Sequence, residues 1–399
     1  MHDGDAPRAS GAPQTPADSN APEGWRTPND ERTLEDLRAS LSGDRTQIDA
    51  IDEQILGLLH QRVACALRVG EKKSQLGLPL YDPTRERKIY ERLTGHNRID
   101  GTLPDAAIVS IFREVISACR QAEHPTSVAF LGPSGTNTQE AAVRFFGSAF
   151  SPLPCGNPDE VCEATLRGAE SGGTDYGVLA IENSLHGVVS PTLDLLASSP
   201  LTVCAEINLP IRHCLLSNTE LGQITTVYSH EQAIAQCRRW LSAHLPGATL
   251  VPVTSTARGA EMAAANSTSA AICSKIAADI YGLHIVAEGI EDGAANTTRF
   301  FVVAANPPLP APTGRDKTSL AFQVPHTPGA LVSVLEVFNN HGINLTMIQS
   351  RPSRQANWEY RFFADLQGHR DDPKLRAALA DLKGITVSTK IMGSYPEGG

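Results

Sequence analysis

The chain has 399 residues, of which 41% are hydrophobic and 20% charged, and its formal net charge is −10. This length allows two or three domains, and the composition is that of an ordinary globular protein. The acidic balance argues against nucleic-acid binding as the main function, although it leaves room for a local basic pocket that binds a small acid. No apolar run approaches the roughly 20 residues that a membrane-spanning helix needs, so we expect no membrane association.

Residues 1–33 are predicted to form a disordered tail. They contain five prolines and only Met1 and Trp25 as large apolar side chains, too few to offset the entropy of ordering. The acidic start and the lack of an apolar core argue against a secretory signal. The eight cysteines are scattered without a C-x-x-C pair. The simplest interpretation is that they are buried thiols in a reducing cytosol. We therefore expect a cytoplasmic protein.

Residues 34–123 are predicted to form an all-α domain. Ile48, Ile51, Ile55 and Leu58 recur at helical spacing and give an amphipathic stripe. A second helix is expected to start at Asp82-Pro83, because an N-cap residue precedes a proline at the first helical position. A third helix is expected to start near Thr102-Leu-Pro104.

Charged side chains accompany this stripe. Arg62 and Lys73 are 11 residues apart, about 20° of rotation on a helix with ~3.6 residues per turn, so they share a face. Arg45 lies 17 residues before Arg62, roughly 25 Å away at ~1.5 Å per residue, so the two cannot clamp one small molecule from the same straight helix. Each charge alone is most simply part of a solvated face. Further charged residues open the second helix: Asp82, Arg85 and Glu86.

Together, the segments Leu58–Arg62, Val69–Lys73 and Asp82–Glu86 resemble the helical chorismate mutase family at that family's spacings. The resemblance implies a homodimer or larger homo-oligomer in which Arg45 crosses into the partner's site. Chorismate is a dicarboxylate that rearranges without a nucleophile or general base, so orientation and charge stabilisation suffice. The implied substrate contacts are Arg45 and Arg62 at the carboxylates, Lys73 at the breaking ether oxygen and Glu86 at the ring hydroxyl, with Asp82 and Arg85 beside them.

The third helix departs from the family pattern. Where the family has a serine and, four residues later, a glutamine, this chain has Cys119 and Glu123. We expect Cys119 to line the substrate site and Glu123 to act at the ether oxygen. The alternative is that Glu123 ends the helix in solvent.

Residues 127–304 alternate β-rich runs with helical patterns, which predicts an α/β domain. The expected helices include Thr138–Phe146 and Glu231–Leu245. The expected strands are Ser127–Gly132, Tyr176–Glu182, Leu201–Leu216, Thr225–Tyr228, Thr249–Val253, Ala270–Ser274 and Arg299–Val303.

Three segments of this block carry chemistry. Gly132-Pro-Ser-Gly-Thr136 can hold an anion at a helix N-terminus, or it is a plain turn, and it lacks a nucleotide-binding fingerprint. The others are Ile181-Glu-Asn-Ser184 at the end of a strand and Asn296-Thr-Thr-Arg-Phe300 entering another. Together they resemble the prephenate dehydratase family, which implies two lobes around a cleft.

The resemblance implies that Thr298 is the catalytic residue. Prephenate loses carbon dioxide and its ring hydroxyl, and aromatisation drives the reaction, so a hydroxyl that donates a hydrogen bond to the departing hydroxide suffices. We expect neither a cofactor nor a metal. Ser229 is also explained by a capping box with Gln232. The remaining implied substrate-binding residues are Thr136, Glu182, Asn183, Ser184, Ser229, Gln236 and, for the carboxylates, Arg299.

The C-terminal part begins with a proline-rich linker over residues 305–317. Residues 318–396 predict strand–helix–strand–strand–helix–strand, the ferredoxin-like βαββαβ order. Two motifs, Gly329-Ala-Leu-Val332 and Gln349-Ser-Arg-Pro352, resemble those of the ACT domain of prephenate dehydratases. The resemblance implies that L-phenylalanine is an effector, bound between subunits. The alternative is that the motifs are a helix cap and a strand-end turn. The implied effector-binding residues are Gly329, Ala330, Leu331 and Val332, then Gln349, Ser350, Arg351 and Pro352. Gln349 replaces the usual glutamate and removes a negative charge.

The predicted protein is therefore a multidomain enzyme with an all-α mutase domain, a two-lobed α/β dehydratase domain and a regulatory domain. One alternative fuses the mutase to an NAD-dependent prephenate dehydrogenase, against which the missing dinucleotide fingerprint counts. The other is a non-catalytic sensor, since two-lobed α/β domains also bind small molecules; Thr298 next to Arg299 argues for catalysis.

Overall fold

The computed structural model describes residues 34–76, 83–293, 296–307, 311–352 and 360–398. The predicted tail over 1–33 and the predicted N-cap Asp82 lie outside these residues. The all-α prediction is confirmed for the first block, which forms α1 (Leu34–Gln75), α2 (Pro83–Asp100) and α3 (Asp105–Glu123).

Helix α1 has an apolar stripe whose side chains are exposed in the part of the chain that the structure describes. Ile51 is 46% exposed and Leu58 is 63% exposed, and Ile48 and Ile55 are similar. Helix α3 differs, because its last two turns bury Ile116, Ser117, Cys119 and Arg120.

The first lobe of the α/β block is built on one mixed sheet. Its main path has the order β2-β1-β3-β11-β5, with β4 paired to β3. Strand β1 is parallel to β2 and β3, whereas β11 is antiparallel to β3 and β5. The strands are β1 (Ser127–Leu131), β2 (Ser151–Cys155), β3 (Tyr176–Asn183), β4 (Gly187–Val188), β5 (Thr202–Pro210) and β11 (Thr297–Ala304). Its helices are α4 (Asn137–Phe146), α5 (Pro158–Arg167) and α6 (Ser190–Ser198), with a 3-10 turn at Ala169–Ser171.

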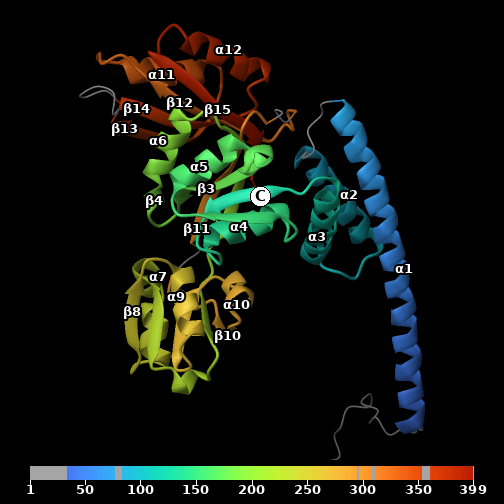
Figure 1. The fold of residues 1–399 in the computed structure, drawn as a ribbon. Helices are drawn as coiled ribbons and strands as arrows, with labels where there is room; N and C mark the ends of the chain where they lie inside the picture. Colours follow the sequence, from blue (N-terminus) through green and yellow to red (C-terminus); the bar gives the residue numbers. More distant parts are fainter. Residues whose placement is uncertain (1–33, 77–82, 294–295, 308–310, 353–359, 399) are drawn as a thin grey trace, which may run out of the picture. The chain divides into compact units, whose positions relative to one another are not determined.

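The second lobe has its own sheet, of order β10-β6-β9-β7-β8 (Figure 1, green to gold). The chain enters it between β5 and β6 and leaves it between β10 and β11, so two short crossings join the lobes. The strands are β6 (Cys214–Ser217), β7 (Thr226–His230), β8 (Thr249–Val253), β9 (Ser269–Cys273) and β10 (His284–Glu288). The helices are α7 (Glu231–Gln236), α8 (Arg238–His244), α9 (Thr256–Ala264) and α10 (Ile276–Tyr281), with a 3-10 turn at Leu221–Gln223.

Two predicted elements are each divided in the structure. The run Leu201–Leu216 is two strands, β5 and β6, because the chain leaves one sheet at Pro210 and enters the other at Cys214. The predicted helix Glu231–Leu245 breaks at Cys237, whose φ of −111° and ψ of 12° lie outside the helical region.

The third sheet confirms the βαββαβ prediction. Its strand order is β13-β14-β12-β15, and Figure 1 shows α11 and α12 on the same face of it. The elements are β12 (Asp316–Gln323), α11 (Ala330–Asn340), β13 (Leu345–Pro352), β14 (Tyr360–Gln367), α12 (Pro373–Leu382) and β15 (Ser388–Pro396).

The other face of this sheet packs on the first lobe. Phe301 and Val303 of β11 belong to one buried cluster with Phe363 and Tyr395. The approach is so close that a Cβ on Gly393 would lie 2.0 Å from the backbone oxygen of Val203. The two domains therefore share a hydrophobic core, which fixes their mutual position.

Candidate active sites

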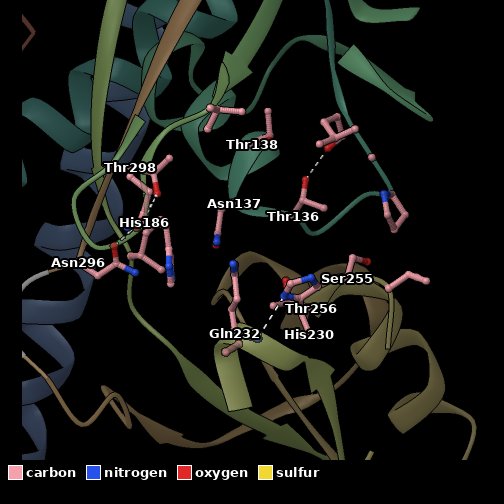
Figure 2. Close-up of a pocket in the computed structure, with 18 of the residues that line it drawn as sticks. Thr136, Asn137, Thr138, His186, His230, Gln232, Ser255, Thr256, Asn296 and Thr298 are labelled. Atoms are coloured by element: carbon pink, nitrogen blue, oxygen red, sulfur yellow. Dashed lines mark hydrogen bonds between the residues drawn. The ribbon is translucent and has the colours of Figure 1, made fainter. Parts of the chain in front are cut away.

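A cavity of about 970 Å³ opens between the two lobes of the α/β block. Figure 2 shows side chains from both lobes pointing into it, with Thr136 and Thr298 from one lobe and Gln232 and Thr256 from the other. Four of the predicted residues line it: Thr136, Asn183, Gln236 and Thr298.

Thr298 lies next to Asn183, because β11 pairs with β3 in a register that places the two residues opposite each other. The Asn183 amide nitrogen donates to the Thr298 hydroxyl oxygen at 2.8 Å and to Asn296 Oδ1 at 2.7 Å. Its amide oxygen accepts from the backbone N–H groups of Leu185 and His186. Two donors on the oxygen fix which end of the amide is which.

This arrangement determines where the Thr298 proton can point. A hydroxyl has one proton and two lone pairs, and Asn183 occupies one of the lone pairs. The proton is therefore available to a molecule in the cavity. The Thr298 hydroxyl can therefore donate a hydrogen bond to a molecule in the cavity.

Gln236 connects the hydrogen-bonded residues Asn183, Asn296 and Thr298 to the second lobe. Its amide oxygen accepts from His213 Nε2 at 2.7 Å and from Asn296 Nδ2 at 3.4 Å, and its amide nitrogen lies 3.2 Å from His186 Nε2. His213 and Asn296 are buried, whereas His186 is exposed. A continuous chain of hydrogen bonds thus runs from His213 to Thr298 across both lobes.

Two helix N-termini face the cavity from opposite sides. Thr136 caps α4 by accepting from Gln139 N, and its own hydroxyl donates to Leu131 O at 2.9 Å. Ser255 caps α9 by accepting from Arg258 N at 3.0 Å. The free N–H groups and dipoles of such helix ends favour anions, and none of the residues recorded along this cavity is a lysine or arginine.

The sequence reasoning missed part of this lining. His186, His213, His230, Ser255 and Thr256 come from loops and helix starts whose neighbours in space cannot be read from one chain. One signal was available: a serine followed by a helical pattern marks an N-cap, which is the role of Ser255.

Arg299 does not fit its predicted role at the substrate's carboxylates. Side chains alternate along a strand, so it points away from Thr298, to the opposite face of the sheet. There its Nε donates to Glu206 at 2.7 Å and its Nη1 to Asp365 at 2.5 Å, and it is absent from the cavity lining. Glu182 pairs with Arg299 in the same register and is also absent from that lining.

Two predicted serines likewise lie outside the cavity lining. Ser184 closes the end of β3, where its hydroxyl accepts from Thr297 N at 3.0 Å. Ser229 is completely buried, and its hydroxyl donates to Ile272 O at 2.6 Å. The capping-box alternative for Ser229 is wrong as well, because His230 is the N-cap of α7.

In the helical block, one carboxyl lies among several cations. Burial raises the pKa of the Glu123 carboxyl above its ordinary value, although nearby cations oppose this shift. Its side chain packs against α1, where a Cβ on Gly70 would lie 3.4 Å from Glu123 Cβ. The cations are Lys73, Arg62, Arg120 and Arg85, in falling order of effect. Three predicted mutase residues therefore lie close enough to Glu123 to act on its charge.

The remaining predicted mutase residues lie elsewhere or are already paired. Glu86 accepts from Arg120 Nη1 at 2.9 Å, and this pair is largely buried. Cys119 is buried at 4% exposure. Arg45 is exposed on α1, and Asp82 lies outside the described residues.

The predicted effector motifs occupy the start of α11 and the strand β13. Gly329 caps α11 with a φ of 81°, a left-handed conformation that favours glycine, and Val332 is exposed. In β13, Gln349 and Ser350 lie at the edge of the sheet, and Arg351 donates to Asp194 of α6 at 2.8 Å. The structure therefore uses Arg351 to attach the third domain to the first lobe.

Within the described residues no cluster of histidine, cysteine and acidic side chains could hold a metal ion. No helix among them is long and apolar enough to cross a membrane. All eight cysteines are free, and all but Cys65 are buried.

Comparisons with known families divide the chain in the same way. Residues 44–124 match chorismate mutase type II, residues 128–308 match prephenate dehydratase, and residues 318–384 match the ACT domain.

Relatives cover nearly the whole chain. A bifunctional chorismate mutase/prephenate dehydratase from Aquifex aeolicus is 43% identical over 88% of this chain and 97% of its own length. A crystal structure of prephenate dehydratase in complex with L-Phe from Arthrobacter aurescens is 37% identical, with a TM-score of 0.63 over 68% of this chain and 90% of its own. A structure described as GqqA, a novel type of quorum quenching acylase, is 30% identical with the same TM-score over 68% of this chain and 97% of its own.

Proposed function

The chain belongs to the family of bifunctional chorismate mutase/prephenate dehydratases, and on this premise we propose that prephenate is converted to phenylpyruvate in the cavity beside Thr298. The first reaction of the family rearranges chorismate to prephenate, and the second removes carbon dioxide and hydroxide from prephenate. The observation that supports the proposal is the hydrogen bond from Asn183 to the Thr298 oxygen, which leaves the threonine proton available to a molecule in the cavity.

In the second reaction the bond from the ring to its carboxylate breaks, and its electron pair enters the ring. The carbon–oxygen bond on the opposite side of the ring breaks, and hydroxide leaves while carbon dioxide is released. Thr298 donates a hydrogen bond to that departing oxygen, where negative charge develops. Because aromatisation drives the reaction, a neutral hydroxyl in a fixed orientation is sufficient.

The two carboxylates of prephenate need partners other than Arg299. The N-termini of α4 and α9 face each other across the cavity, each capped by a hydroxyl that leaves backbone N–H groups available. We assign the carboxylates to these two helix ends. Gln236 contacts His213 and Asn296 and so bridges the two lobes. This bridge sets the distance between the two helix ends.

For the mutase reaction we propose the site around Glu123, with Arg62 at a carboxylate and Lys73 at the ether oxygen. The cations that act on Glu123 support this assignment, because chorismate brings two negative charges. Arg45 is assigned to the site of a partner subunit. The exposed apolar stripe of α1 supports a homodimer, because a soluble chain rarely leaves such a surface open.

We propose that L-phenylalanine binds at the start of α11 and the edge strand β13 and inhibits the dehydratase. The exposed Val332 and the left-handed Gly329 leave the helix end open to a small ligand. The free cysteines fit a reducing cytoplasm.

The test supplies chorismate to the purified chain without NAD and follows prephenate and phenylpyruvate. We expect prephenate to form and then to be consumed as phenylpyruvate appears. Release of a hydroxyphenylpyruvate that requires NAD would indicate the dehydrogenase alternative, and binding without turnover would indicate a sensor. Either result would overturn the proposal.

A further inference from the structure

Arg299 occupies the boundary between the dehydratase and the ACT domain. It follows Thr298 on β11 and extends to the opposite face of the sheet, over the ring of Phe301 at 4.9 Å. There it contacts Glu206 of β5, Asp365 of β14 and Tyr395 of β15. A single side chain thus joins the strand that carries Thr298 to two strands of the ACT sheet.

The contacts on the ACT side form a closed ring of hydrogen bonds. Arg299 Nη1 donates to Asp365 Oδ2 at 2.5 Å, and Nη2 donates to the Tyr395 oxygen at 3.1 Å. Ser319 donates its only proton to Asp365 Oδ1 at 2.5 Å, so the 2.6 Å contact with Tyr395 must use the tyrosine proton. Every donor in this ring has one acceptor, which leaves the guanidinium a single orientation.

The ring is buried and its charges are balanced. The side chains of Glu206 and Asp365 are 0% and 1% exposed, and that of Arg299 is 11% exposed. Lys317 supplies the second cation, 2.9 Å from Glu206. A buried ionic network keeps its geometry only when every member has its partner. Removal of one partner therefore displaces the other members.

We propose that Arg299 is a positioning residue through which the ACT domain holds Thr298 in its reactive position. Consecutive Cα atoms are about 3.8 Å apart, so any shift of the Arg299 backbone that follows a change of its ACT partners also moves the backbone of Thr298. A change in the ACT sheet reaches the catalytic hydroxyl through one side chain. This inference goes beyond the proposed function and rests on it only for the role of Thr298.

The test removes one ACT partner without touching the cavity. Asp365→Asn keeps the shape of the side chain but weakens the contact to Arg299. We expect kcat for prephenate to fall about tenfold or more, since a misplacement near 1 Å is enough for such a loss. KM for prephenate should stay near its original value, because Asp365 is absent from the cavity lining that holds both helix ends. An unchanged circular dichroism spectrum and thermal unfolding transition of the same sample show that the dehydratase and ACT domains are folded.

A matched control breaks another contact between the same two domains. Asp194→Asn removes the ion pair with Arg351, which attaches the ACT domain to α6 rather than to β11. We expect this variant to retain the original kcat for prephenate. At position 299, Arg299→Lys should keep more activity than Arg299→Met, because it preserves the buried positive charge. Tyr395→Phe removes one member of the ring and should also lower kcat.

Equal kcat values for the Asp365→Asn, Tyr395→Phe and Asp194→Asn variants would overturn the inference. So would a loss in Asp365→Asn that appears only in KM. Both outcomes are distinct from a failure of the proposed function, in which the unaltered chain would not convert prephenate at all.

Discussion

At the scale of single residues, Thr298 and Arg299 divide two tasks between the two faces of one strand. Sequence motifs predict the role that we propose for Thr298, because these motifs lie in a short segment of chain. They could not place Arg299, because its partners Glu206 and Asp365 lie 93 and 66 residues away in the sequence. A cation beside a proposed catalytic residue suggests substrate binding, whereas the structure pairs Arg299 with Glu206 and Asp365 outside the cavity lining.

Asn183 gives a direct test of the hydroxyl orientation. In Asn183→Asp, both amide donors are replaced by a carboxylate oxygen, so Thr298 would donate its proton to that carboxylate instead of to the substrate. We expect kcat for prephenate to fall at least about 100-fold, within the range of a lost proton donor. An Asn183→Asp enzyme with normal kcat would show that the orientation of Thr298 is set in another way.

Glu123 predicts a pH dependence for the mutase alone. Its carboxyl has a raised pKa, so the protonated form, which can donate to the ether oxygen, persists to higher pH than in a free carboxyl. Mutase activity should therefore fall as the pH rises through this pKa, because the ionised form repels the charge that develops on the oxygen. Glu123→Gln should flatten the profile and raise activity at high pH.

The measurement is kcat/KM for chorismate as a function of pH, with dehydratase activity recorded on the same samples. The dehydratase should not follow the same curve. A mutase profile that Glu123→Gln leaves unchanged would mean that this side chain merely ends α3.

At the scale of elements, the sequence pattern predicts the strands and helices with buried, periodic faces. It misses β2, whose sequence Ser-Pro-Leu-Pro-Cys has two prolines and four exposed residues. Proline is tolerated there because β2 is an edge strand with one neighbour. The same reasoning cannot divide Leu201–Leu216, because both halves are apolar and buried in different sheets.

The effector site at the start of α11 is tested better by substitution than by deletion. Removal of the ACT domain would also remove Asp365 and Tyr395 and uncover Phe301. Gly329→Ala adds a methyl group at a left-handed position and costs about 1 kcal/mol locally. We expect the phenylalanine concentration for half-inhibition of the dehydratase to rise severalfold. Unchanged inhibition would place the effector elsewhere.

At the scale of the whole molecule, the chain links its domains through individual side chains. Arg120, the partner of Glu86, also donates to the Phe146 backbone oxygen of the dehydratase. Arg87 of α2 donates to the Glu397 backbone oxygen beyond β15 at 2.9 Å. These contacts place α2 and α3 next to the dehydratase and ACT domains, although the chemistry of the domains is separate.

A shared mutase site between two subunits predicts complementation. Arg45→Ala and Lys73→Ala should each be inactive as a mutase. When both variants are co-expressed, random pairing gives mixed dimers in half of all cases, and each mixed dimer has one intact site. About a quarter of the normal mutase activity should therefore return. No recovery in dimers proven to be mixed would contradict the assignment of Arg45 to the partner's site.

The central claim is that one chain holds two independent active sites, and Thr298→Ala tests it most directly. With chorismate as the only substrate, this variant should accumulate prephenate at the normal rate and form no phenylpyruvate. Lys73→Ala should show the reverse, with loss of chorismate consumption and normal conversion of supplied prephenate. If folded Thr298→Ala protein lost both activities, or still formed phenylpyruvate at the normal rate, the account would be contradicted.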